Sequence, residues 1–264
     1  MTYVPITDAE IDVDSPVTQV LLTKYRDNIA FSGKVFDYQE FTASGTWTKP
    51  AGAVGTDVAR IQVVGGGQSG ARGTISGTGQ QNGGEGAGGV IFETTCARLG
   101  ATEAVIVGAG GASVTGTTSR NSGGDSTFGT DAEPTDDGFT FIRANGGSSG
   151  ANVEFGPSAG EGTVLANSIC DGGLAGGGNG TVGGVSVYGA GGGAGATTST
   201  YCQGGFSQFA GKGGDGGYNA APATLPIDGE FPGGGGGGVK VNATNLPNSG
   251  AGGDGVVRVW ILKG

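Results

Sequence analysis

The sequence contains no histidine in its 264 residues and only three cysteines. Without histidine the chain lacks the commonest general base, and it cannot form a Ser-His-Asp or Cys-His catalytic arrangement or a histidine-containing zinc site. Cys96, Cys170 and Cys202 are far apart and odd in number, so they do not predict the dense disulfide framework of a small secreted domain. At most one disulfide can form among them.

Basic residues are also scarce, since 13 Lys and Arg stand against 23 Asp and Glu for a formal net charge of −10. The chain therefore has no basic stripe to neutralise phosphates, and we expect no nucleic-acid partner. No apolar run is long enough for a membrane-spanning helix, and the first residues lack the basic and apolar segments of a leader. We expect neither a bilayer nor a secretory route.

Glycine, in contrast, is abundant, with 63 residues against an average usage of about 7%. Ordering a glycine costs more backbone entropy than ordering any other residue, so a fold built on it needs many compensating contacts. Collagen is excluded because proline numbers only 9 and glycine does not recur at every third position. A flexible linker is disfavoured because strand-like runs separate the glycine tracts.

The first 40 residues contain almost no glycine and form a separate segment by composition. Asp14-Ser15-Pro16 is a helix start signal, and the sequence predicts a short helix over about 16–28. Val17, Leu21 and Tyr25 are spaced by four residues, so they lie on one face and are candidates for attachment to a partner.

Upstream of this helix, acidic and apolar residues alternate from Asp8 to Asp14. A calcium loop is one interpretation, but the segment lacks the glycine and the distant glutamate that an EF-hand loop requires. We therefore favour a solvated or partner-facing edge and predict no metal site.

From residue 41 to residue 264 short apolar segments alternate with glycine tracts, and we predict one glycine-rich domain over this range. The fold class we expect is mostly irregular and β, with few helices. A small β-sheet base carries packed polyglycine II rods and their connecting loops. The expected strands are 41–47, 58–64, 90–94, 105–107 and 256–262, the last of them buried on most of both faces.

The rods acquire hydrogen bonds only from one another, because polyproline II geometry makes none within a segment. Positions inside the layers must then be glycine or alanine, as in residues 189–195. Every third position can point outward, and we expect Glu85, Asn179 and Asp215 to do so.

Catalytic and cofactor chemistry finds no support in the motifs. Residues 84–89 and 178–183 match G-x-G-x-x-G, but both lead into strand-like residues and not into a helix, so the dinucleotide context fails. Asp136 and Asp137 precede a glycine, which is typical of a turn and not of a glycosidase carboxylate pair. We expect no cofactor and no enzymatic activity.

Recognition has more residues to use, because several aromatics between the tracts belong to no strand pattern. Exposed aromatics among small polar residues provide a large contact area at a low cost in entropy. They can also close the ends of the rod bundle as small apolar plugs, and the sequence leaves both roles open. The receptor-binding candidates are Tyr188, Tyr201, Phe206, Phe209, Tyr218 and Phe231.

Three phrases resemble the glycine-rich domains of bacteriophage tail fibres and tail-tip adhesins. They are residues 41–53 around Trp47, residues 122–129 with 141–147, and residues 252–259. The resemblance covers about 41–264. It implies a non-enzymatic receptor-binding protein, and in T-even-like members the glycine tracts form a sandwich of polyglycine helices whose loops touch the host.

The same resemblance implies a location in the virion tail, at a distal fibre or tip. Residues 10–30 are similar to the short attachment segments of such proteins, so other tail proteins are the expected partners of residues 1–40. The receptor is a host surface protein or polysaccharide, and both a homotrimer and a monomer are compatible with the sequence. The alternatives are a purely structural head or tail protein and, ranked last, an ice-binding protein.

Overall fold

The computed structural model describes most of the chain from Val35 onward. The helix expected over about 16–28, with Val17, Leu21 and Tyr25, lies outside the described residues. Within them the only helical element is a 3-10 turn at Cys96–Arg98, and the rest is strand, rod or loop, which confirms the mostly irregular and β class. The described ranges are 35–74, 82–115, 120–129, 141–148, 153–155, 163–164, 173–174, 176, 181–187, 189–195, 202–217, 225–241 and 248–264.

Two antiparallel sheets form the base of the molecule, where a single small sheet was expected. The first sheet has the order β1-β12-β3-β5-β10 and the second has the order β2-β6-β7-β8-β9. The expected strand over 41–47 is divided between them, since β1 ends at Phe41 and β2 begins at Gly45. The strands of the first sheet are β1 (Val35–Phe41), β3 (Val58–Val64), β5 (Gly89–Thr95), β10 (Thr163–Val164) and β12 (Val256–Leu262), and those of the second are β2 (Gly45–Thr48), β6 (Thr102–Ile106), β7 (Ser126–Gly129), β8 (Phe141–Ala144) and β9 (Val153–Phe155).

The hydrophobic core lies between these sheets. Alternate residues of β3 and β12, such as Ile61 and Val259, point inward and are fully buried, as period-two strand geometry requires. Trp47 of β2 and Phe128 of β7 face them from the other sheet, with ring centroids 5.7 Å apart at an interplanar angle of 63°. Burying each such side chain contributes about 1.5–3 kcal/mol, which gives this end of the chain an ordinary sandwich core.

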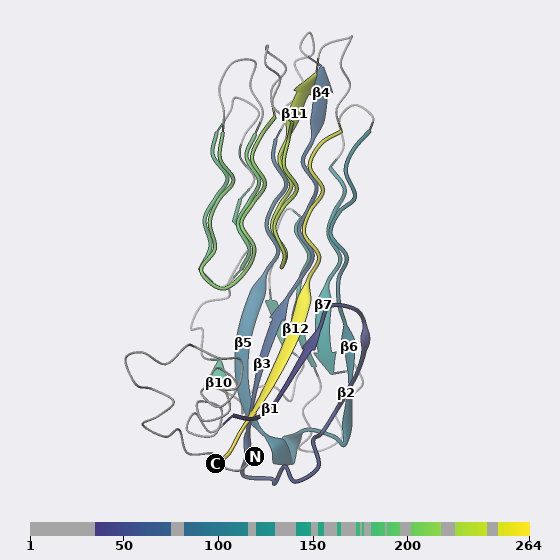
Figure 1. Ribbon diagram of the computed structural model, residues 1–264, viewed down its shortest axis with the longest axis vertical. Coiled ribbons are helices and arrows are strands. Elements are labelled where there is room, and N and C mark those ends of the chain that lie inside the picture. The colour runs from purple at the N-terminus through teal and green to yellow at the C-terminus, as the bar shows by residue number, and fades with distance from the viewer. Residues whose placement is uncertain are drawn as a thin grey trace, which may run out of the picture.

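Above the sandwich, the strands continue without a break into extended glycine rods (Figure 1). β3, for example, runs into residues 65–71, and residues 248–255 run down into β12. Further rods lie beside these without continuing a strand, and a short parallel pair, β4 (Arg72–Thr74) with β11 (Val239–Val241), lies near the far end. The rods are residues 65–71, 82–88, 107–115, 120–125, 145–148, 173–176 without 175, 181–187, 189–195, 202–206, 211–217, 225–230, 233–238 and 248–255.

The backbone hydrogen bonds of rod 65–71 establish the polyglycine II geometry. Successive amides donate to different neighbours and return to the first neighbour after three residues, which is the turn length of this helix. The carbonyls of the same rod accept from rods that lie between those neighbours, so the rod stands at the centre of a hexagonal lattice. The amides of Gly65, Gln68 and Ala71 donate to the carbonyls of Gly88, Glu85 and Asn82, respectively. Those of Gly66 and Ser69 donate to Gly124 and Asn121, and those of Gly67 and Gly70 donate to Gly253 and Gly250.

Glycine is required inside this lattice because the rods touch through their backbones. A Cβ placed on Gly67 would overlap the carbonyl of Gly234, and one on Gly193 would overlap that of Gly236. Ala190 and Ala194 are the exceptions in rod 189–195, and both are fully buried. The expectation that buried rod positions are glycine or alanine is confirmed for this rod, but it is wrong for rod 65–71, where Gln68 and Ser69 are buried.

One expectation about the outward positions is wrong. The Asp215 side chain is only 8% exposed. It accepts a hydrogen bond from the Gly204 amide at 2.8 Å and contacts Lys212 Nζ at 3.0 Å. Because rods pack on more than one side of residues 211–217, the carboxylate lies within the lattice and serves as a partner for an amide. Glu85 is also largely covered, and Asn179 lies outside the described residues.

The molecule has two distinct ends along its long axis. Val35 pairs with Leu262 at the end of the sheet that lies away from the rods, and the Gly264 amide donates to Asp57 at the same end. The rods extend in the opposite direction (Figure 1). Since β1 begins at Val35, the sheet also takes in residues 35–40, while the domain boundary at 40/41 stays a prediction.

Candidate functional site

A groove opens where the rod lattice meets the outer face of the first sheet. Rods 202–206 and 211–217 are joined by the turn 207–210, which lies over this face close to β3 and β5. The groove measures about 640 Å³, within the roughly 300–1,000 Å³ that is typical of small-molecule sites. Its walls are Arg60, Gln62, Ile91, Gln208, Phe209, Ala210, Arg258, Trp260 and Leu262.

Strand register places the outward side chains of the sheet in two rows that cross β1, β12, β3 and β5. Residues paired across antiparallel strands present their side chains on the same face and interact directly. Each row therefore brings together residues from four separate parts of the chain. The first row is Tyr38, Trp260, Arg60 and Glu93, and the second is Glu40, Arg258, Gln62 and Ile91.

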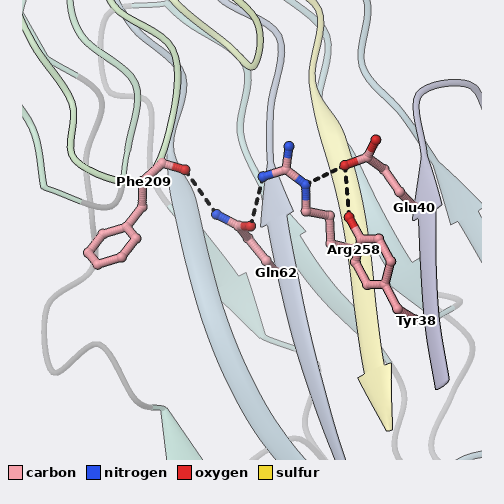
Figure 2. Close-up of polar contacts among 5 residues, drawn as sticks. All are labelled: Tyr38, Glu40, Gln62, Phe209 and Arg258. Atoms are coloured by element: carbon pink, nitrogen blue, oxygen red, sulfur yellow. Dashed lines mark hydrogen bonds and ion pairs between the residues drawn. The ribbon is translucent and has the colours of Figure 1, made fainter. Parts of the chain in front are cut away.

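The second row is fixed by a chain of hydrogen bonds (Figure 2). Gln62 Nε2 donates to the Phe209 carbonyl at 3.1 Å, and its Oε1 accepts from Arg258 Nη1 at 3.2 Å. Arg258 Nε donates to Glu40 Oε2 at 2.6 Å, and the Tyr38 hydroxyl donates to the same oxygen at 2.9 Å. The planar groups of Gln62 and Arg258 are thereby held in one orientation beside the groove.

The first row is fixed by an ion pair and a ring contact. Arg60 Nη2 lies 2.6 Å from Glu93 Oε1, and the rings of Tyr38 and Trp260 are 5.3 Å apart at 31°. Each arginine of the groove is thus paired with a glutamate, Arg60 with Glu93 in this row and Arg258 with the glutamate of the second row. The groove carries polar groups but little net charge.

Two pKa shifts follow from these contacts. The hydrogen bond from Arg258, followed by that from Tyr38, holds the pKa of Glu40 below its ordinary value. Partial burial, followed by the hydrogen bond to Glu40, raises the pKa of the Tyr38 hydroxyl. At neutral pH the carboxylate is therefore an anionic acceptor and the phenol remains a donor, so the network is intact.

Of the aromatic receptor-binding candidates, Phe206, Phe209 and Phe231 lie within the described residues, and all are exposed, at 61%, 41% and 45%. They belong to the ends and turns of the rods that face the sandwich. Of these three only Phe209 borders the groove, while the ring centroid of Phe206 lies 5.5 Å from Lys212 Nζ. Tyr188, Tyr201 and Tyr218 lie outside the described residues.

Sequence reasoning did not single out the groove residues of the sheet. The strand 256–262 was expected to be buried on most of both faces, but Arg258, Trp260 and Leu262 are only half-buried and form one wall of the groove. Among the described residues that line this groove, only the turn 207–210 lies over the outer face. The signal available was the alternation of Arg258 and Trp260 with Val257 and Val259.

Of the two glycine motifs considered for cofactors, residues 84–89 are part of the lattice, and 178–183 lies only partly within the described residues. The Gly84 and Gly86 amides donate to the Gly236 and Gly173 carbonyls, so they have no donor left for a phosphate. Within the described ranges no group of at least three His, Cys, Asp or Glu side chains could hold a metal ion. No helix of the described part of the chain is long and apolar enough to cross a membrane.

These features define a β-sandwich whose strands extend into a hexagonal lattice of polyglycine II rods, with exposed aromatic side chains on the sheet face and at the rod turns. The chain belongs to the glycine-rich domain family, whose family model matches residues 40–261. No curated protein matches the chain.

Proposed function

We propose that this protein is a bacteriophage tail adhesin that attaches to the virion through residues 1–40 and binds a receptor on the host surface. The sequence resemblance over residues 41–264 motivates the proposal. The receptor is bound by the side chains between the glycine rods, and the rods themselves are scaffold. The adhesin acts without a catalytic step.

The observation that carries the proposal is the separation of scaffold from side-chain chemistry. The lattice is held by backbone hydrogen bonds and is mostly glycine and alanine where rods touch, and its few buried polar side chains, such as Ser69 and Asp215, are already partners of backbone amides, so it has little with which to recognise a ligand. Large exposed aromatics are found instead at the rod ends and turns, as at Phe206, Phe209 and Phe231. Exposed aromatics of this kind are favoured in binding surfaces because they bury a large area at low entropic cost.

The two ends of the molecule suit a protein fixed at one end. The residues that precede Val35 join the molecule at the sandwich end, opposite to the direction in which the rods extend. An attachment segment there leaves the far ends of the rods free, and the turns that carry Phe206, Phe209 and Phe231 stay exposed where the rods meet the sandwich.

A competition experiment tests the proposal. The full chain is added in excess to host cells before the phage that encodes it, and the rate of phage adsorption is measured. We expect a reduction of at least tenfold. The variant Phe206→Ala/Phe209→Ala/Phe231→Ala should lose this effect, whereas Ile106→Ala, which removes an exposed apolar side chain from the second sheet, should retain it.

Unchanged adsorption in the presence of the folded wild-type chain contradicts the proposal. If antibody labelling then finds the chain along the tail or on the head, a purely structural virion protein replaces the adhesin. Labelling at the distal tip together with competition supports adhesion.

A further inference from the structure

We propose that the groove between the first sheet and the turn 207–210 binds a neutral saccharide, with a sugar ring against Trp260 and its hydroxyls on Gln62 and Arg60. The inference deepens the proposed function, on which it rests for the biological source of the saccharide, a glycan of the host surface. The binding chemistry itself depends only on the groove.

The lining combines the groups that recognise a sugar. A pyranose ring has one face of C–H groups that lies well against an indole, and Trp260 offers an indole at the groove wall. The ring also carries adjacent hydroxyls, which pair with planar side chains that have donors or acceptors side by side. Arg60, Gln62 and Gln208 are such side chains, and they line the same groove.

Charge argues for a neutral ligand. Arg60 and Arg258 form ion pairs of 2.6 Å with Glu93 and Glu40, so neither guanidinium is left as an isolated cation for a phosphate or sulfate. The whole chain carries a formal charge of −10, which repels polyanions at longer range. A hydroxyl-rich ligand without charge meets neither obstacle.

Size argues for a small ligand. A stable protein interface takes about 800 Å² and roughly 20–30 residues from each partner. The groove of about 640 Å³ is bounded by nine of the described residues and has the volume of a site for one or a few sugar rings.

The polar wall is also preorganised. Gln62 is held by the Phe209 carbonyl on one side and by Arg258 on the other, and its second Nε2 hydrogen remains available. Because these groups are already ordered, a ligand does not have to fix their rotamers on binding, which favours affinity.

Intrinsic fluorescence provides a direct test, since the chain has only two tryptophans. Trp47 is fully buried in the core and Trp260 lines the groove, so collisional quenching by acrylamide reports mainly on Trp260. The probes are neutral oligomers of glucose, galactose and N-acetylglucosamine and the purified surface polysaccharide of the host, with inorganic sulfate as the anionic probe. We expect a neutral saccharide to reduce quenching at least twofold and sulfate to have no effect.

Variants of the full chain assign the site. Trp260→Ala and Gln62→Leu should weaken saccharide binding at least tenfold by calorimetry, while Trp260→Phe, which keeps a ring, should retain most of it. Val185→Ala, which shortens an exposed side chain on a rod, is the matched control and should bind normally. Thermal melts establish that each variant is folded. If Trp260→Ala does not fold, the comparison of Trp260→Phe and Gln62→Leu with wild type still tests the site.

The outcomes separate this inference from the proposed function. Absence of binding to every neutral probe and to the host polysaccharide overturns the inference, as does binding to sulfate alone, or a host partner that protease treatment destroys. If Trp260→Ala competes with phage adsorption as well as wild type, the groove is not the receptor site and the adhesin proposal stands. If saccharide binding depends on Trp260 but the chain does not compete with phage adsorption, the saccharide site in the groove is supported and the adhesin proposal is contradicted.

Discussion

The Gln62 side chain of the sandwich donates a hydrogen bond of 3.1 Å to the backbone carbonyl of Phe209, 147 positions later in the chain. On its other side the turn is held to the lattice by Ser207, whose hydroxyl donates to the Gly189 carbonyl at 2.7 Å and accepts from the Ala210 amide at 3.0 Å. The turn is therefore attached both to the rods and to the sheet. Gln62 is a connection between the two parts of the fold.

Gln62→Leu should release the turn 207–210 from the sheet. The substitution removes the hydrogen bonds that Gln62 makes to the Phe209 carbonyl and to Arg258, both of which are partly buried. We therefore expect the free energy of unfolding to fall by about 1 kcal/mol. Urea denaturation measures this loss, and hydrogen exchange at Ala210 should become faster. Gln39→Leu is the control, because its 3.1 Å bond to the Thr48 carbonyl is exposed and should contribute less. Equal losses in the two variants would contradict the assigned role of Gln62.

Gly193→Ala should disrupt the rod lattice. The added Cβ would overlap the Gly236 carbonyl, and neither backbone can move without breaking its own hydrogen bonds. Overpacking of this kind costs about 1–3 kcal/mol and here we expect the upper end or more. Gly45→Ala is the matched change, since its nearest atoms are the Phe41 ring carbons at 3.7 and 3.8 Å, and it should alter the melting temperature little. A stable Gly193→Ala variant would show that the rods are not in backbone contact there.

Trp47→Ala and Trp260→Ala should differ sharply in stability. Trp47 is fully buried against Phe128, so its truncation should cost about 3–5 kcal/mol. Trp260 lies half-buried on the outer face, and its truncation should cost about 1 kcal/mol through the lost contact with Tyr38. Chemical denaturation of both variants measures the difference. Similar losses would mean that the outer face is as buried as the core.

Acid should weaken the sandwich through Asp57. The hydrogen bond from Lys263, followed by that from the Val54 amide, lowers the pKa of this carboxyl below its ordinary value of 3.8. The folded state therefore favours the ionised form, and the stabilisation is present above about pH 4 and is lost as pH falls through the lowered folded pKa. Wild type should be more stable than Asp57→Asn at pH 7, and the difference should shrink in acid.

Denaturation midpoints from pH 7 to pH 2 test this expectation. Lys263→Met removes the cation that lies 2.8 Å from Asp57 Oδ2, so it should move the acid transition to higher pH. A difference between wild type and Asp57→Asn that stays constant down to pH 2 would contradict the role given to this carboxylate.

Much of the fold could be predicted from local patterns. The strand 58–64 has the expected bounds, because Ile61 and Val63 alternate with Arg60 and Gln62 in a run free of glycine. The strand 256–262 was predicted for the same reason. The split of 41–47 between two sheets was missed, because the short segment 42–44 at which the chain changes sheet carries no proline or glycine to mark it.

The groove could be predicted only in part. Phe209 was selected as an aromatic outside the strand patterns, and it borders the groove. Trp260 and Arg258 were assigned to a buried strand, since a sequence indicates which residues share a face but not what covers that face. The cover here is a turn from a distant segment, held by the Phe209 carbonyl.

The sequence by itself determined that glycine forms an ordered scaffold, that alternating apolar runs form its base, and that the chain has no histidine of its own. Tertiary structure alone decided which rods are neighbours, where Asp215 is buried, and that Arg60, Gln62, Arg258 and Trp260 meet in one groove. The physical reason is that a polyglycine II rod makes no hydrogen bonds within itself, so each rod is defined by partners that lie far away in the chain. Local composition selects the rod, and long-range backbone hydrogen bonds select its place in the lattice.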